Sequence, residues 1–339
     1  MPHASALPLP IASESPRLLW AALLAGVAAA CLLGLYVGPG DLSDPALRAT
    51  LLELRACRVA AAFLSGAALS VAGVLAQAIF HNPLASPSML GVTSGAALGG
   101  KLGLLAHALL FAGASRLPVA PDMLVPVGCM GGALVSLLLL TAIARRIEGK
   151  VALLLAGFLL SSLFLSLGSF VITLGQGQWE LGRALIGFTL GGVGGAGTRQ
   201  VLLVLPIAVI GTFAALGWSR SLDALLSGET EASALGVDTR LAKRCCIGWC
   251  ALLSAGAVCV GGNVMFVGLI VPHALRPLLG VAHGALIPAS AVAGGAFLVL
   301  CDVLARLAPA GGELPLGVIT GLVGAPLFFV LLVRSMPRG

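Results

Sequence analysis

The sequence predicts an all-α protein whose helices cross a lipid bilayer. Of its 339 residues, 59% are hydrophobic and only 9% are charged, whereas a soluble domain carries about 25% charged residues. So few charges could not cover the surface of a water-soluble fold of this size. The 46 glycines and the single tyrosine also do not suit an outer-membrane barrel, which carries aromatic girdles. Helices are therefore the expected membrane-spanning elements.

Ten apolar runs are the candidate membrane spans. A helix needs roughly 20 residues to cross a hydrocarbon core of about 30 Å. Nine runs are close to this length, and they cover 18–37, 57–80, 89–111, 123–144, 151–174, 200–218, 244–262, 285–307 and 314–333. The tenth, 264–279, is shorter and is interrupted by Pro272, His273 and Arg276. We predict ten transmembrane helices in one domain over 18–334, with tails at 1–17 and 335–339.

The distribution of basic residues predicts the orientation in the membrane. Ten crossings place both tails on one side, and 11 of the 19 lysines and arginines fall on that side. Because basic loops face the cytoplasm, both tails are expected there. The run at 18–37 is longer than a signal-peptide core, so we expect it to be retained. A lipoprotein-type cleavage before Cys31 is the minor alternative.

Two connecting segments have a distinct character. Residues 183–197 are apolar but too short to cross, so a re-entrant or interfacial helix is expected. The longest polar segment, 219–244, holds eight of the 32 charged residues. Its apolar residues are spaced roughly as one helical face, while Gly228 and Gly236 are typical of helix ends. These apolar residues are Leu222, Leu225, Leu226, Ala232 and Leu235. We predict a cytoplasmic elbow of two short helices.

Several motifs that would indicate enzymatic chemistry are incomplete. Residues 95–101 begin like a phosphate-binding loop, but Leu102 stands where a hydroxyl should bind the metal, and no strand precedes it. We interpret Gly91, Gly95, Gly99 and the Gly317/Gly321 pair as faces where helices pack closely in lipid. The histidines and the eight cysteines show no metal-ligand spacing. We expect no catalytic residue, no metal site and no cofactor bound by this chain, and the scattered basic residues do not indicate nucleic-acid binding.

The charged residues inside the apolar runs are more informative, because a charge near the bilayer centre costs at least about 2.5 kcal/mol. Asp302 and Arg306 are spaced i,i+4 near the end of the ninth run. One interpretation is a structural ion pair across one helical turn. The other is that Arg306 faces outward with Arg55 and Arg58, as a set of arginines able to bind the carboxylates of a partner. The sequence alone leaves both open.

Four stretches resemble the FecCD/BtuC-type permeases of bacterial ABC importers. They are 55–100, 227–237, 261–280 and 301–332, and the similarity extends from Arg55 to Arg334. The resemblance implies ten spans in the inner membrane and a second permease subunit, for which an identical copy is the first expectation and a paralogue the alternative. It also implies two cytoplasmic ATPase subunits that bind ATP and Mg²⁺, and a periplasmic binding protein. The permease itself would be a transport subunit with no ATPase site of its own.

The resemblance also implies roles for particular residues. The elbow at 219–240 would seat in the ATPase through Gly228, Glu229, Glu231, Ala232, Leu235 and Gly236. The binding protein would dock on Arg55, Arg58 and Arg306. Asn82 and Leu84, in the turn after the second run, match a cytoplasmic gate.

The cargo implied by the family is a bulky metal chelate. An iron(III)-siderophore or haem is the first expectation, with vitamin B12 as the alternative. A secondary transporter driven by an ion gradient is a less favoured class, because it would need acidic or histidine relay residues near the midplane. Asp302 is a poor candidate for that role, since it pairs with Arg306 near a span end. A membrane-embedded enzyme would need clustered polar groups within the spans, which the isolated Gln77 and Asn263 do not supply.

Overall fold

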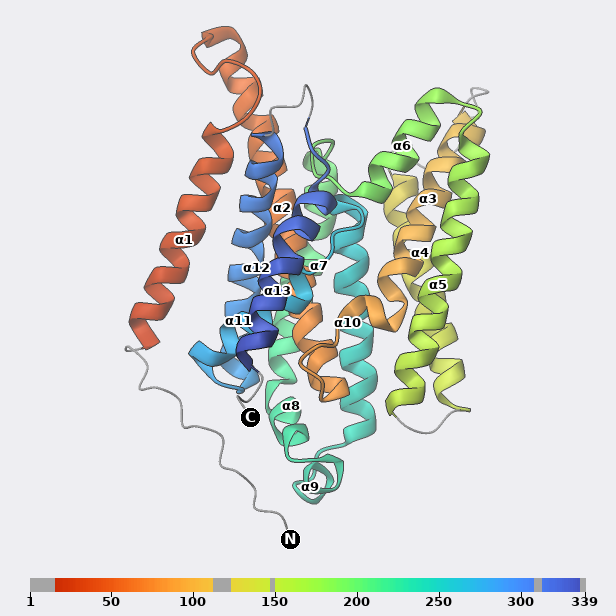
Figure 1. The fold of residues 1–339 in the computed structure, drawn as a ribbon, viewed down its shortest axis with the longest axis vertical. Helices are drawn as coiled ribbons and strands as arrows, with labels where there is room; N and C mark the ends of the chain where they lie inside the picture. The colour runs from red at the N-terminus through yellow and green to blue at the C-terminus, as the bar shows by residue number, and fades with distance from the viewer. Residues whose placement is uncertain (1–15, 112–122, 147–149, 308–312, 336–339) are drawn as a thin grey trace.

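The computed structural model describes residues 16–111, 123–146, 150–307 and 313–335, and every regular element in these ranges is a helix (Figure 1). The helices are α1 (Pro16–Tyr36), α2 (Pro45–Phe80), the 3₁₀ helix η1 (Pro87–Leu90), α3 (Val92–Phe111), α4 (Leu124–Ala144), α5 (Lys150–Gly175), α6 (Trp179–Leu190), α7 (Thr198–Gly217), α8 (Ser219–Leu226), α9 (Glu229–Ala234), α10 (Thr239–Gly261), α11 (Val267–Leu279), α12 (His283–Arg306) and α13 (Leu316–Ser335). The all-helical prediction is confirmed for this part of the chain.

Each of the ten predicted runs falls on a helix. Among the described residues, seven helices are long and apolar enough to cross a membrane, namely α1, α2, α4, α5, α7, α10 and α12. α11 and the apolar part of α13, Leu316–Leu331, are shorter, and α3 carries Lys101 and His107 within its sequence. The number of ten crossings therefore stays a prediction. The predicted tails 1–17 and 335–339 lie almost entirely outside the described residues.

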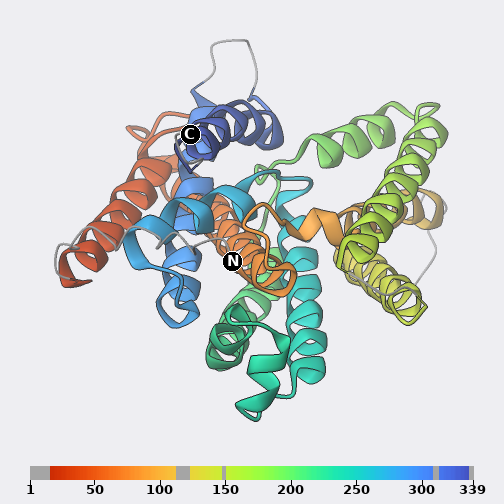
Figure 2. The same ribbon diagram turned by 60° about the horizontal axis from the view of Figure 1, so that its bottom comes forward.

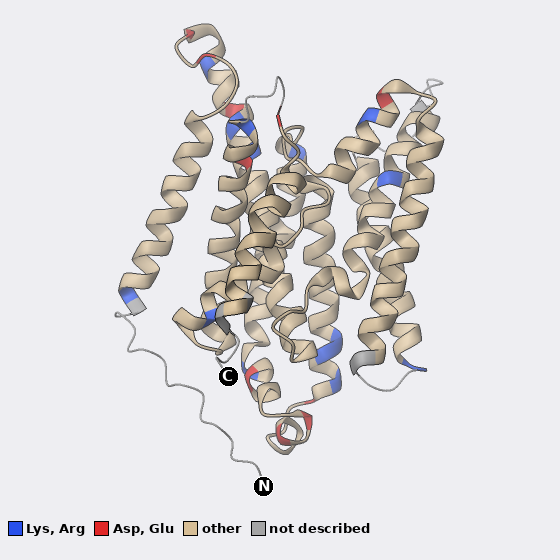
Figure 3. Ribbon diagram, in the orientation of Figure 1, with Lys and Arg blue, Asp and Glu red and all other residues tan. Residues whose placement is uncertain are grey.

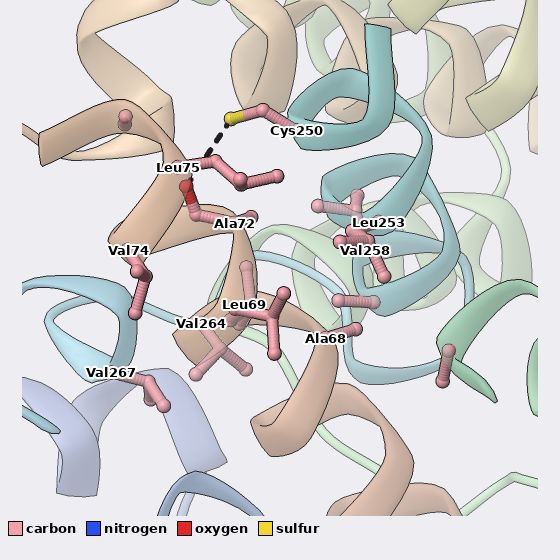
Figure 4. Packing of buried hydrophobic residues seen from close by; sticks show 14 of the residues in the cluster. Ala68, Leu69, Ala72, Val74, Leu75, Cys250, Leu253, Val258, Val264 and Val267 are labelled. Carbon is pink, nitrogen blue, oxygen red and sulfur yellow. Dashed lines mark hydrogen bonds between the residues drawn. The ribbon is translucent and has the colours of Figure 1, made fainter. Parts of the chain in front are cut away.

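α2 is the central helix of the bundle. Its apolar part is 89% buried, because α10, α11, α12 and α7 pack around it. Two contacts are so close that only glycine fits: a Cβ on Gly66 would overlap the carbonyl of Gly294 in α12, and one on Gly73 would overlap the carbonyl of Gly268 in α11. Figure 4 shows the core on the α10 side, where the Cys250 thiol lies 3.4 Å from the Ala72 carbonyl oxygen.

α2 is also longer than the sequence predicted. The apolar run begins at 57, but the helix begins at Pro45 and has 36 residues, about 54 Å at 1.5 Å per residue. The Asp44 carboxylate accepts a hydrogen bond from the Ala46 N–H at 2.9 Å, which caps the helix. The correction follows from solvation: outside the hydrocarbon core a helix needs no apolar residues, so Arg48 and Glu53 do not end it.

A second group of helices, α3, α4, α5 and α6, stands beside the group built around α2 (Figure 2). The close packing predicted at Gly95 and Gly99 of α3 is confirmed, since a Cβ on Gly99 would overlap the Gly128 carbonyl and one on Gly95 would lie 2.7 Å from the Gly132 carbonyl oxygen. Gly91 instead ends η1 with φ +77°. Of the Gly317/Gly321 pair, only Gly317 packs closely, because a Cβ there would overlap the Leu190 carbonyl oxygen. α6 has 12 residues, too few to cross a membrane. It is followed by the irregular residues 191–197.

Charged residues concentrate toward the two ends of the bundle (Figure 3). One end carries α8 and α9, and the beginning of α1 and the end of α13 lie on that side. The opposite end carries the α1–α2 connection and the outer parts of α2 and α12. Polar contacts between helices are therefore expected at the two ends of the α2–α12 pair.

Candidate functional site

The elbow (residues 219–240) contains the two short helices that the sequence predicted, α8 and α9. Leu222, Leu225 and Ala232 are fully buried and hold these helices against the bundle. Gly228 precedes α9 with φ +124° and ψ 162°, a conformation essentially restricted to glycine. Gly236 follows with φ +83°. Both glycines are thus fixed by the backbone path of the elbow.

Two histidines join α8 to the ends of the transmembrane helices. His283 begins α12, and both its backbone N–H (2.8 Å) and its Nδ1 (2.7 Å) lie against Oδ1 of Asp223 in α8. The Asp223 carboxylate therefore caps α12 from a different helix. His81, which follows α2 with φ +51°, places its Nε2 2.5 Å from the Leu225 carbonyl oxygen. Displacement of α8 would act directly on α12 and α2.

Three elbow residues face away from the bundle. Leu235 is 74% exposed and Leu226 45% exposed, and Glu231 is exposed beside them. The Glu229 carboxylate is less available to a partner protein than that of Glu231, because it pairs with Lys243 of α10 at 2.5 Å. The elbow thus presents apolar and acidic side chains together, on a backbone held in place by Leu222 and Leu225.

Arg55 lies at the opposite end and is buried. Its Nη1 donates to the carbonyl oxygens of Leu35 (3.1 Å) and Tyr36 (2.9 Å) at the end of α1. Its Nη2 donates to the carbonyls of residues 38, 39 and 40 at 2.9, 3.0 and 3.2 Å. Positive φ angles at Gly38 and Gly40 allow the chain to curl around the guanidinium. A cation suits this place because the last carbonyls of a helix lack intrahelical donors.

Arg58 and Arg306 share the Asp302 carboxylate. Arg58 Nε donates to its two oxygens at 3.0 and 3.1 Å, and Arg306 pairs with it across one turn of α12. Arg58 also contacts Glu313 at 2.8 Å. Arg306 further donates to the carbonyls of Gly34 and Val37, each at 2.8 Å. We call these residues the arginine cluster; its members are Arg55, Arg58, Asp302, Arg306 and Glu313.

These contacts decide between the two interpretations of the sequence. The structural ion pair of Asp302 and Arg306 is confirmed, with both side chains 1% exposed. The expectation that Arg55 and Arg306 are exposed to a partner is wrong in this structure, because α2 continues past them and the α1–α2 connection covers them. Arg58 is 14% exposed and borders a cavity of about 290 Å³ that Glu313 and the glycines at 191–195 also line. The docking role itself stays a prediction.

The predicted gate residues form the turn that follows α2. The Asn82 side chain accepts a hydrogen bond from the Leu84 N–H at 2.9 Å, and the Asn82 N–H donates to the Gln77 carbonyl at 3.1 Å. Both side chains are partly exposed. The turn lies next to His81, and therefore next to the contact with α8. Its role as a gate stays a prediction.

A feature that the sequence analysis missed is a line of hydroxyl groups on α5. Ser162, Ser166, Ser169 and Thr173 are exposed, and each hydroxyl donates to the carbonyl four residues earlier. Their spacing of four, three and four residues places them on one face, a signal that the sequence contained. Exposed leucines and phenylalanines flank them, so α5 shows a narrow polar line within an apolar surface.

The parts of the chain that the structure describes contain no group of three His, Cys, Asp or Glu residues able to hold a metal ion. The cysteines are free, and five of the eight are buried within the helix packing. Lys101 is 4% exposed in α3 and fits against Gly168 of α5, where a Cβ would lie 2.9 Å from its Nζ. The functional candidates are thus surfaces and contacts between helices.

Comparison with known proteins assigns the family. Residues 15–334 match the FecCD transport family. The chain belongs to this family. It is 36% identical over 318 residues to the vitamin B12 import system permease protein BtuC of Escherichia coli, covering 92% of each chain. It is also 36% identical over 299 residues to the uncharacterized ABC transporter permease protein YvrB of Bacillus subtilis, covering 87% of this chain and 82% of YvrB.

A third relative gives a similar result. The cobalamin import system permease protein BtuC of Halobacterium salinarum is 36% identical over 282 residues, 82% of this chain and 72% of that protein. Among solved structures, an inward-facing metal-chelate type ABC transporter aligns with a TM-score of 0.83 and 30% identity, covering 94% of this chain and 99% of that chain. The FecCD family member described here is thus a membrane permease of the ABC importer type.

Proposed function

We propose that this FecCD family member is the permease subunit of a binding-protein-dependent importer that moves a bulky metal chelate across the bacterial inner membrane. Two copies would enclose the pathway, with the hydroxyl line of α5 facing it. Two ATPase subunits would bind ATP and Mg²⁺ and seat on the elbow, and both tails would lie in the cytoplasm. The observation that carries this proposal is the elbow: exposed Leu235 and Glu231 on a segment fastened to α2 and α12.

The cargo we propose is a corrinoid or an iron chelate. The B12 permeases that match over 92% of both chains support the corrinoid. The solved metal-chelate type transporter, with 30% identity, supports the broader class that includes an iron(III)-siderophore or haem. Uptake of radiolabelled cyanocobalamin, a ferric siderophore and haem into proteoliposomes with the complete complex would separate these cargoes.

The binding protein would dock on the end that carries the arginine cluster. Arg58 is partly exposed and lines a cavity at that end together with Glu313, so a carboxylate of the partner could bind to Arg58 there. Arg58→Gln is expected to weaken docking of the binding protein. ATPase assembly at the other end of the molecule should stay as in the unmodified permease.

The elbow assignment is tested by replacing Glu229 and Glu231 together with alanine. We expect at least a tenfold loss of ATPase subunit retained on the purified permease, because the acidic surface of the elbow and the Glu229–Lys243 pair are both removed. The matched control is Glu53→Ala with Glu180→Ala, two exposed acids outside the elbow. Equal ATPase retention in both double variants would contradict the assignment.

The rival class makes a different prediction. A secondary transporter would continue to take up its cargo when the ATPase subunit is inactivated and an ion gradient is supplied. We expect uptake to stop under these conditions and to resume with active ATPase and ATP.

A further inference from the structure

The Arg58 guanidinium is already engaged by two carboxylates of this chain. Its Nε lies 3.0 and 3.1 Å from the two Asp302 oxygens, and its Nη2 lies 2.9 Å from one of them. Its Nη1 lies 2.8 Å from each oxygen of Glu313. All three nitrogens of the guanidinium therefore face a carboxylate. A carboxylate of a docking protein can form the paired contact typical of arginine only by replacing one of these two.

The two carboxylates differ in how firmly they are held. Asp302 is 1% exposed and is shared with the equally buried Arg306, so its release would strand a buried charge. Glu313 is 38% exposed, and an ion pair of this kind contributes little to stability. Glu313 is thus the carboxylate that an incoming partner displaces at low cost.

The chain leaves room beside Arg58 for such an exchange. The cavity of about 290 Å³ that Arg58 and Glu313 line has four glycines between 191 and 195 in its wall. A Cβ on Gly194 would lie 3.4 Å from both Arg58 Nη1 and Glu313 Oε2. A larger side chain at this position would pack against the ion pair from the side of the cavity. The glycine therefore keeps the ion pair accessible there.

Glu313 also connects the segment before α13 to α2. The Leu314 N–H donates to the Ala305 carbonyl of α12 at 3.1 Å, and the Leu316 N–H donates to the Gly191 carbonyl at 3.0 Å. The ion pair with Arg58 adds a side-chain link from this segment to α2. Displacement of Glu313 would therefore release that link at the moment when the partner binds.

We propose that Glu313 occupies the place on Arg58 that a carboxylate of the binding protein takes on docking, so that docking exchanges one carboxylate for another. The proposal rests on the proposed function and specifies how the same site is regulated. Glu313 lowers the affinity for the binding protein, because its ion pair with Arg58 must break first. It also selects the partner, since a neutral side chain does not replace the charge-assisted hydrogen bonds that are lost.

The test measures the affinity between the complete complex in nanodiscs and the purified binding protein that stimulates its ATP hydrolysis. Glu313→Gln keeps the size of the side chain and removes its charge. We expect the Glu313→Gln complex to bind this protein about 2- to 5-fold more tightly, as for removal of a competing, partly exposed ion pair. Surface plasmon resonance of the variant and the unmodified complex would measure the change.

Two controls separate the exchange from a general effect of charge. Glu53→Gln removes an exposed acid from the same part of α2 that carries Arg55 and Arg58, and it should change the affinity less than Glu313→Gln does. In the Arg58→Gln background, Glu313→Gln should give no gain, because the site for which the carboxylates compete is absent. The two single variants and the double variant form a double-mutant cycle.

Unchanged or weaker binding by Glu313→Gln would overturn the exchange. An equal gain with and without Arg58 would also overturn it, because the effect would then belong to long-range charge. Both results leave the proposed function in place if the complex still imports cargo. If no binding protein binds the unmodified complex or stimulates its ATP hydrolysis, the proposed function fails, and the exchange fails with it.

Discussion

The two ends of the α2–α12 pair are held by different chemistry. At one end, the buried Asp302 lies between the buried Arg306 and the partly exposed Arg58, and Arg55 and Arg306 donate to the carbonyls at the end of α1. At the other end, His81 contacts one backbone carbonyl of α8, and His283 contacts the Asp223 carboxylate of α8 through its backbone N–H and its Nδ1. Asp223 is 38% exposed, whereas Asp302 is 1% exposed. One end is thus held by a network of mostly buried charges, and the other by a few hydrogen bonds to a partly exposed helix.

This difference suggests a division of roles. Breaking a buried ion pair strands a charge, so the arginine cluster fixes the relative position of α1, α2 and α12 at that end. A half-exposed cap can be broken and remade at low cost. We therefore expect movement during transport to occur at the elbow end, where the proposed ATPase would act.

The largest effect is expected from Asp302→Ala. It removes the carboxylate that Arg58 and Arg306 share and leaves the buried Arg306 with no carboxylate partner, and removal of one partner from a buried pair costs about 3–5 kcal/mol. Thermal or denaturant unfolding of the purified permease in detergent would measure the loss. A midpoint within error of the unmodified permease would contradict the network described here.

An intermediate effect is expected from Asp223→Ala at the elbow end. Loss of a helix cap costs roughly 0.5–2 kcal/mol, so stability should fall less than in Asp302→Ala. The amount of cargo imported per ATP hydrolysed should fall more than in Asp302→Ala, because the contact between α8 and α12 is lost. Asp223→Asn retains the acceptor oxygen and should recover this ratio. If the alanine and asparagine variants couple equally well, the cap does not transmit the movement.

The smallest effect is expected from Glu313→Ala, which compares a partly exposed ion pair of the arginine cluster with the buried pairs of Asp302. Glu313 is 38% exposed and pairs with Arg58 at 2.8 Å, and exposed ion pairs contribute about 0–1 kcal/mol. Its unfolding midpoint should lie close to that of the unmodified permease. A loss as large as that of Asp302→Ala would mean that the cluster acts as an inseparable unit.

The features that the sequence predicted depend on local pattern. The apolar runs indicated the helices, and the i,i+4 spacing of Asp302 and Arg306 indicated their pair. The N-terminal extension of α2 was missed although Asp44 and Pro45 signal a helix start, because hydropathy alone set the boundary. The turn residues Gly228 and Gly236 were predicted because a backbone position with positive φ is usually occupied by glycine.

The features that the sequence did not predict depend on distant partners. Arg58 meets Asp302 across 244 positions, and His283 meets Asp223 across 60. The burial of Arg55 follows from a curled connection whose path no local spacing specifies. The Glu313 carboxylate likewise meets Arg58 only when the surrounding helices are in place, since the two residues are 255 positions apart.

Proline distribution gives the bundle an unequal stiffness. α7, α11, α12 and α13 each contain interior proline, at Pro206, Pro272, Pro277, Pro288 and Pro326, and every such residue removes one backbone hydrogen bond. α2 has its proline at the first position and none within. α2 and its neighbour α10, which has no interior proline either, should therefore bend less than α7, α11, α12 and α13. Pro288 lies five residues after His283. We therefore expect α12 to bend next to its first turn, which Asp223 caps.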